Sequence, residues 1–289
     1  MAILMFWGFA VVYALRVNLS VAIVDMVPAT GTNKSNRGEC AKNLSTYSPI
    51  ELTLEPMRAH NNNTYDWTSE QQGLVLGAFF YGYITTQFLG GYLADRFGAK
   101  ILFGVGVGCT SILTILTKPI ADLGFGYMIA LRVLEGIGEG VTFPAATSFW
   151  GRWAPPNERA SLAALAYSGA QFGTIISMPI SGIICQTLGW PSMFYIFGSI
   201  SCIWVVIWFI LAESTPAKYS GMAPRELEYI TAKLPSSKQS TTSVPWLNIL
   251  CSIPFWSILF AHVCFGSDAK LFSITRILYT HPCVIGKTY

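Results

Sequence analysis

Long apolar runs constrain the fold of this chain more than any other feature. A helix needs about 20 mostly apolar residues to cross the hydrocarbon core of a bilayer. Runs of this kind occupy residues 1–27, 69–92, 101–117, 126–150, 162–188 and 192–212, and a weaker seventh begins near Ile249. Only 11% of the residues are charged, against about 25% in an ordinary soluble domain. The sequence therefore predicts an all-α polytopic membrane protein.

The polar segments between these runs divide the chain into parts. We expect a six-helix transmembrane bundle over residues 1–212, with a lumenal loop at 25–67, and then a cytoplasmic central loop at 213–248. The start of a seventh helix at 249–265 and a divergent tail at 266–289 follow. Thr68 and Gln71 have the spacing of a capping box, which predicts a helix start. Residues 224–234 predict a short surface helix with one apolar face.

Two patterns predict which loops face the cytoplasm. Three glycosylation acceptor sequences, at Asn33, Asn43 and Asn62, lie in the loop 25–67, and such sequences are glycosylated only on a lumenal or extracellular face. Basic residues are frequent in the opposite loops, as expected of cytoplasmic loops in membrane proteins. Both patterns place the N-terminus in the cytoplasm.

The composition argues against several functional classes. The net charge of +3 is small, and there is no basic run with interleaved aromatic residues, so we expect no nucleic-acid partner. Seven cysteines and three histidines form no pair with metal-ligand spacing, so we expect no metal site and no cofactor. Because no catalytic constellation appears either, we do not expect an enzyme.

Four charged residues lie well inside the apolar runs, away from the ends of the runs. Arg132, Glu135 and Glu139 are spaced i, i+3 and i+7, which places them on one helix face, and Arg16 lies within the first run. Each charge at mid-bilayer costs about 2.5–3.5 kcal/mol even by low estimates. A buried ion network that only fixes helix packing would explain the pairing. Proton coupling would also explain why two carboxyls stand close together, because burial and like charge both favour protonation of one of them.

Small residues accompany these charges. Gly136 and Gly140 lie beside the glutamates, and a stripe of small residues runs along the fifth predicted helix, formed by Gly169, Gly173, Ser177 and Ser181. Such stripes allow helices in membranes to approach closely. Arg16 can bind a carboxylate substrate through two parallel hydrogen bonds.

The segment GGYLADRFGAKIL, between the second and third predicted helices, resembles the loop signature of the major facilitator superfamily. The matching residues that we assign to a cytoplasmic gate are Gly91, Asp95, Arg96, Gly98 and Lys100. The glycines would permit a tight turn, and Asp95 could meet a cation or a helix N-terminus.

Further segments resemble the anion transporter branch of this superfamily, which includes sialin, the vesicular glutamate transporters and the sodium–phosphate cotransporters. Sialin is the most similar of the three. The matching segments run in order from about Ile3 to Phe265, namely YALRVNLSVAIVDMV, GAFFYGYITTQ, LRVLEGIGEGVTFP, WAPPNERA and GWPSMFYIFGS.

The resemblance implies a proton-coupled carrier of organic anions, such as sialic acid or acidic amino acids, in a lysosomal or vesicular membrane. Arg16 would bind the substrate anion with Tyr13, Tyr83 and Tyr167 lining the cavity. Glu135 and Glu139 would couple protons, with Arg132 as their partner.

Such carriers have twelve helices, so the resemblance implies that this chain supplies their N-terminal half, truncated after about Phe265. A phosphate or other anion cotransporter stays open as an alternative. So does a non-transporting half-length protein that modulates a full-length carrier as its partner.

Overall fold

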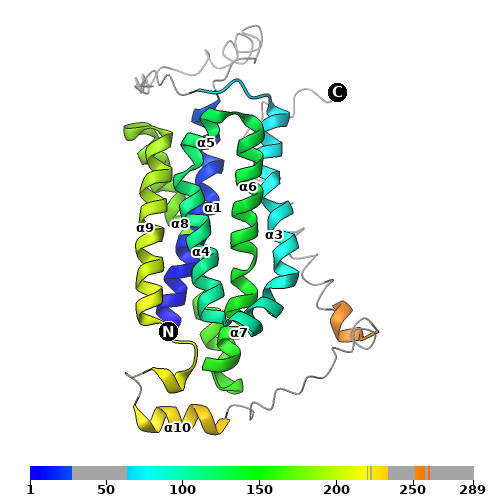
Figure 1. Cartoon of the computed structure of the whole chain (residues 1–289), viewed down its shortest axis with the longest axis vertical. Helices are drawn as coiled ribbons and strands as arrows, with labels where there is room; N and C mark the ends of the chain where they lie inside the picture. Colours follow the sequence, from blue (N-terminus) through cyan, green and yellow to red (C-terminus); the bar gives the residue numbers. More distant parts are fainter. Residues whose placement is uncertain (28–63, 220, 222, 234–250, 258–259, 261–289) are drawn as a thin grey trace, which may run out of the picture. The chain divides into compact units, whose positions relative to one another are not determined.

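The computed structural model describes residues 1–27, 64–219, 221, 223–233, 251–257 and 260, and all regular structure in these ranges is helical (Figure 1). The helices are α1 (Ala2–Met26), α3 (Ser69–Phe97), α4 (Ala99–Ile115), α5 (Thr117–Leu123), α6 (Phe125–Gly140), α7 (Thr142–Trp153), α8 (Pro156–Leu188), α9 (Trp190–Leu211), the 3-10 helix η1 (Pro216–Lys218) and α10 (Pro224–Lys233). The chain divides into two units, and residues 1–30 and 54–235 form the first. In the second unit, residues 253–257 form a helical turn.

Two predicted local features are confirmed. The Thr68 hydroxyl accepts from the Gln71 backbone N–H at 3.2 Å, and the Gln71 side chain accepts from the Thr68 N–H at 3.0 Å, which completes the capping box of α3. Helix α10 forms where the short surface helix was expected, with Ile230 buried on its apolar face.

The run 126–150, expected as one helix, is divided at Val141 into α6 and α7. Pro144 has no backbone N–H, so the carbonyl of Gly140 loses its helical donor. The Thr142 hydroxyl donates to the Glu139 carbonyl at 2.7 Å, so one of the last carbonyls of α6 has a hydrogen-bond partner. The break therefore lies directly beside one of the charged residues singled out in the sequence.

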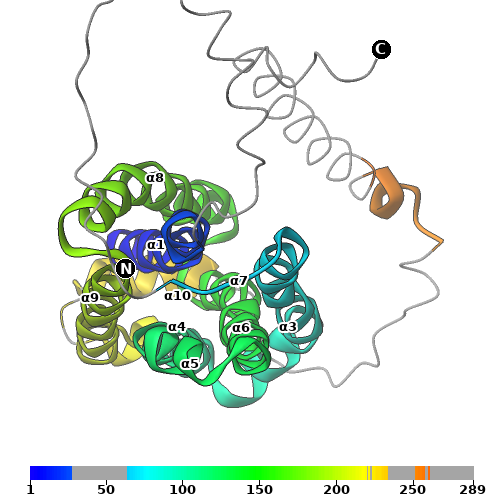
Figure 2. The same cartoon turned by 90° about the horizontal axis from the view of Figure 1, so that it is seen from above.

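Two helix pairs approach so closely that only glycine fits between them. α1 packs along α8, and α3 packs along α6 (Figure 2). A Cβ added to Gly173 on α8 would lie 2.6 Å from the Cα of Ala10, and one added to Gly136 on α6 would lie 2.8 Å from the backbone N of Tyr83. The predicted small stripe on α8 is confirmed, because its four members are all buried.

Apolar side chains form two clusters. The first surrounds Phe9, Phe103 and Trp208 near the end of the first unit where α1 begins. The second surrounds Met128 and Trp190, near the end where α1 stops.

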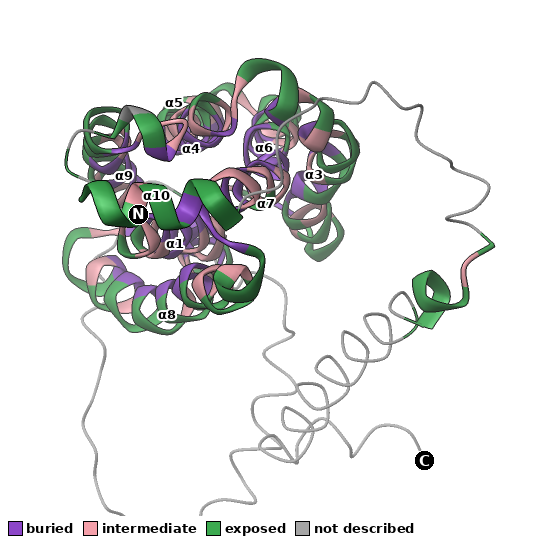
Figure 3. Cartoon of the chain, turned by 90° about the horizontal axis from the view of Figure 1, so that it is seen from below, coloured by how far each residue is buried: buried purple, intermediate pink, exposed green. Residues whose placement is uncertain are grey.

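Large apolar side chains are also exposed on the outside of the bundle. Figure 3 shows exposed residues on the outer faces of α3, α8 and α9, and buried residues facing the interior. Helices α1, α8 and α9 are each long and apolar enough to cross a membrane, and α4 with α5, bent by 54°, makes a fourth candidate span. The exposed apolar faces fit contact with lipid tails, since water would penalise them.

Candidate functional site

Arg16 on α1 and Glu139 on α6 form an ion pair. Arg16 Nη1 donates to Glu139 Oε1 at 3.3 Å. The Glu139 side chain is 1% exposed and the Arg16 side chain 22%, and Glu139 Oε2 has no hydrogen-bond partner among the described residues. A guanidinium carries five N–H groups, so Arg16 keeps donors for a second anion while it holds Glu139.

Four aromatic rings surround the Arg16 guanidinium. Its Cζ lies 4.8 Å from the ring centre of Phe79, 5.0 Å from that of Phe80, 5.2 Å from that of Tyr83 and 5.6 Å from that of Tyr13. Rings at these distances attract a cation through their electron-rich faces. The structure thus brings Tyr13 and Tyr83 to Arg16, as expected. The sequence reasoning missed Phe79 and Phe80, although Phe79 precedes Tyr83 by one helical turn.

A second ion pair lies on the same helix as Glu139. Arg132 Nη1 lies 2.8 Å from Glu135 Oε2, and Thr114 Oγ1 on α4 lies 3.4 Å from Glu135 Oε1. Arg132 was expected to partner both glutamates, but Glu139 pairs with Arg16 instead. Seven residues span about 10 Å along a helix, so Arg132 and Glu139 stand on one face without meeting. The ladder is therefore two separate pairs.

Tyr167 occupies a different environment from the other two tyrosines. Its ring packs against Phe9 and Phe143, with ring centres 5.1 and 5.5 Å apart. Its buried hydroxyl has no hydrogen-bond partner among the described residues. Phe143 also contacts Tyr13 at 6.3 Å, which links Tyr167 to the surroundings of Arg16 through one intervening ring.

A further polar pair, which the sequence reasoning missed, lies within the bundle. The Ser181 hydroxyl on α8 donates to Asn18 Oδ1 on α1 at 3.0 Å, and both residues are fully buried. An asparagine inside an apolar run was the available signal, because an amide in hydrocarbon requires a partner.

Comparison with known proteins places these features in a family. Residues 2–281 match the sequence profile of the Major Facilitator Superfamily. The chain belongs to this superfamily. It is 46% identical to sialin of Homo sapiens over 284 residues, which cover 97% of this chain and 55% of that protein. It is 34% identical to vesicular glutamate transporter 3 of Danio rerio over 277 residues, covering 94% of this chain and 44% of that protein.

A solved structure has a similar fold. The inward-open xylose transporter XylE of E. coli matches with a TM-score of 0.53 at 18% identity, covering 82% of this chain and 52% of that one. The chain spans about half the length of the relatives that it matches. It is an all-α multi-pass membrane protein of the anion transporter branch, with sialin more similar to it than the vesicular glutamate transporters. The superfamily match continues past Phe265, where the sequence motifs stop.

The superfamily motif between α3 and α4 differs from the expected loop. Gly91, Asp95 and Arg96 belong to α3 and Lys100 to α4, so only Gly98 lies between the helices, with φ +94°. Gly98 makes the turn alone because glycine tolerates positive φ. The motif thus consists mainly of the end of α3 and the start of α4.

Asp95 of this motif contacts helix α7, and Arg96 contacts a residue of its own helix. Asp95 accepts from Ser148 Oγ at 3.0 Å and from Arg152 Nη2 at 3.4 Å, both on α7. Arg96 donates to the Tyr92 hydroxyl at 3.3 Å. Asp95 therefore meets a cation, as expected, and that cation belongs to α7.

Lys100, the last residue of the motif, pairs at 3.6 Å with Glu213, which follows α9. This contact ties the start of α4 to the residues after α9 at the same end of the superfamily fold.

The glycosylation candidates Asn33, Asn43 and Asn62 lie outside the described residues of this superfamily member, as does most of the expected seventh helix and tail. Within the described part of the chain, no cluster of three or more His, Cys, Asp or Glu residues could hold a metal ion.

Proposed function

We propose that this chain forms the N-terminal half of a proton-coupled carrier of organic anions, in which Glu139 takes up the coupling proton and Arg16 binds the substrate carboxylate. The ion pair between these two residues carries the proposal. It joins a buried carboxylate to a cation that is partly exposed and has spare donors.

The pair can act as an exchange of partners. When Glu139 is protonated, it loses the charge that holds Arg16, and the guanidinium is released to a substrate carboxylate. When Glu139 gives up its proton, its charge competes with the substrate for Arg16. Binding of proton and anion would thus favour each other, as symport requires, since each ligand changes the affinity for the other by the same factor.

The other residues have supporting roles in this proposal. The rings of Tyr13, Tyr83, Phe79 and Phe80 hold the guanidinium in place when Glu139 is neutral. Glu135 contacts Arg132 and Thr114, and it is a second carboxyl, one helical turn from Glu139, that can take up a proton. Asp95 with Arg152 fastens α3 to α7 and forms the cytoplasmic gate with Gly91, Arg96, Gly98 and Lys100. Tyr167 lines the cavity behind Phe143.

The substrate class and location follow from the relatives. Sialin and the vesicular glutamate transporters support organic anions as substrates. We therefore propose sialic acid as the first substrate to test, acidic amino acids as the second, and the lysosomal or vesicular membrane as the location.

The experiment reconstitutes the purified chain in vesicles, alone and together with the part of human sialin that it does not match. Uptake of labelled sialic acid is measured with and without an inward proton gradient. We expect acid-driven uptake that Arg16→Ala abolishes and that Arg225→Ala, an exposed change on α10, leaves intact. Equal uptake with and without the proton gradient, or unchanged uptake in Arg16→Ala, would contradict the proposal.

A further inference from the structure

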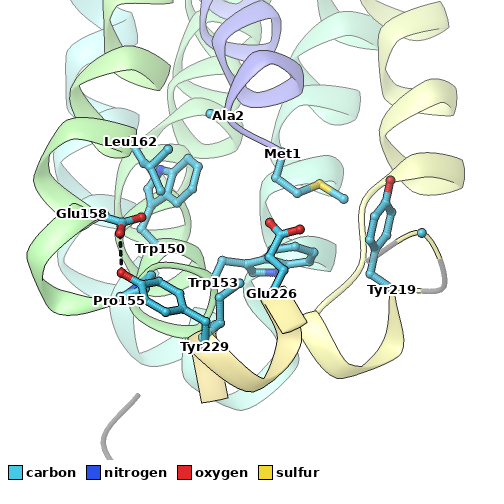
Figure 4. A pocket seen from close by; sticks show the side chains of 12 residues that line it. Met1, Ala2, Trp150, Trp153, Pro155, Glu158, Leu162, Tyr219, Glu226 and Tyr229 are labelled. Atoms are coloured by element: carbon cyan, nitrogen blue, oxygen red, sulfur yellow. Dashed lines mark hydrogen bonds between the residues drawn. The ribbon is translucent and has the colours of Figure 1, made fainter. Parts of the chain in front are cut away.

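A cavity of about 400 Å³ lies at the end of the bundle where α1 begins, away from Arg16, which lies midway along α1. Residues from α1, α7, α8 and α10 line it (Figure 4). Helix α10 closes one side: the Tyr229 hydroxyl donates to Glu158 Oε1 of α8 at 2.8 Å, and Ile230 is buried. The contact is local, so the cavity belongs to the folded unit.

The charged side chains of the described residues that line this cavity are all acidic. The described residues that line it include two carboxylates, Glu158 and Glu226, and no basic side chain. Glu158 is engaged by Tyr229, whose hydroxyl also accepts from Lys233 at 2.8 Å. Glu226 points from α10 toward Met1 (Figure 4). Its carboxylate is therefore the acceptor best placed for a cation inside the cavity.

Aromatic rings form further walls. Trp153 and Tyr219 line the cavity and meet edge to face, with ring centres 6.0 Å apart at 67°. Trp153 is fixed because its indole N–H donates to the Glu213 carbonyl at 2.9 Å. Aromatic rings around an acidic group are the setting in which proteins bind organic ammonium ions.

We propose that this cavity binds an alkylammonium group, with Glu226 as its counter-ion and Trp153 and Tyr219 as aromatic walls. The group could belong to a soluble amine or to the headgroup of an ethanolamine lipid, because both present the same ammonium on a short alkyl chain. This site is independent of the proposed transport function.

The test is calorimetric titration of the 289-residue chain in a non-ionic maltoside detergent, with n-butylammonium as the probe. We expect saturable binding that n-butanol, which is similar in shape but uncharged, does not reproduce. Glu226→Gln should weaken binding about tenfold or more, because a hydrogen bond to a charged group is lost. Tyr219→Leu should weaken it about two- to fivefold.

The matched control is Glu228→Gln, which removes the same charge from the same helix at an exposed position outside the cavity lining. It should leave binding unchanged. Equal weakening by Glu226→Gln and Glu228→Gln, binding of n-butanol as tight as that of n-butylammonium, or no saturable binding would each overturn the proposal.

A second titration identifies the source of the ammonium. The chain is placed in nanodiscs of phosphatidylglycerol alone, or of phosphatidylglycerol with phosphatidylethanolamine. If n-butylammonium binds more weakly in the second set, and Glu226→Gln removes this difference between the sets, the result supports a lipid headgroup as the natural ligand. Equal binding in both sets supports a soluble amine.

Discussion

Arg16 and Glu139 are 123 residues apart in the sequence, and their side chains are 3.3 Å apart in the structure. The contact joins α1 to α6 through the interior of the bundle. Glu139 is fully buried and Arg16 is not, so in the proposed function a change in the charge of Glu139 acts on a cation that an incoming anion could also reach. The proposed function depends on this asymmetry.

The geometry of the guanidinium should matter beyond its charge. Arg16→Lys keeps the positive charge but loses the planar fork that binds a carboxylate through two hydrogen bonds. We expect at least about tenfold weaker binding of sialic acid, as for the loss of one charged hydrogen bond, with little change in thermal stability. Calorimetry and thermal unfolding in detergent measure the two quantities, and Arg225→Lys on α10 is the matched control. Unchanged affinity in Arg16→Lys would remove this residue from the substrate site.

The Arg132–Glu135 pair should contribute to stability because each buried charge has the other as its counter-ion. Arg132→Ala leaves Glu135 buried without its cation, and we expect a loss of about 3–5 kcal/mol in the free energy of unfolding. The double change Arg132→Met with Glu135→Leu should cost less, because neither charge remains. Denaturant unfolding in detergent compares the variants. Equal losses in the single and double variants would show that the two charges do not act as a pair.

The close approach of α3 and α6 should tolerate no side chain at Gly82. A Cβ there would lie 2.9 Å from the backbone N of Ile137, and backbone cannot move aside cheaply. Gly82→Ala should destabilise the protein by about 3 kcal/mol, the upper part of the usual range for overpacking. Gly77→Ala on the same helix is the control, since nothing lies within 4 Å of its added Cβ. Similar yields of folded protein from both variants would contradict the packing described for these helices.

Glycosylation tests the topology. Enzymatic removal of N-glycans should shift the mobility of the protein on a gel, and the combined variant Asn33→Gln, Asn43→Gln and Asn62→Gln should show no shift. Asn18 also stands in an acceptor sequence, but it is buried within α1, so it should carry no glycan. A shift that persists in the triple variant, or none in the wild type, would contradict a lumenal loop at 25–67.

Local signals predicted the fold better than they predicted the site. The capping box at Thr68 and the surface helix α10 both depend on neighbouring residues, and the structure confirms both. The break at Val141 also has a local cause in Pro144, but the apolar run continues through it, so hydropathy alone predicted one helix.

The contacts of the charged residues required the three-dimensional structure. Helical spacing correctly placed Arg132, Glu135 and Glu139 on one buried face. It could not show that Glu139 turns to Arg16, because that pairing depends on how α1 packs against the bundle. Phe79 and Phe80 were missed for the same reason, since aromatic residues in an apolar helix give no sign of which one meets a cation.

The most direct test of the central claim is binding of sialic acid to the wild type and to Glu139→Gln in acidic and in neutral buffer. Glutamine mimics a protonated glutamate, so this variant should bind sialic acid with the same affinity in both buffers, close to that of the wild type in acid. The wild type itself should bind more weakly in neutral buffer, where ionised Glu139 holds Arg16. If Glu139→Gln kept the pH dependence of the wild type, the proton would act elsewhere, and the exchange of partners at Arg16 would be contradicted.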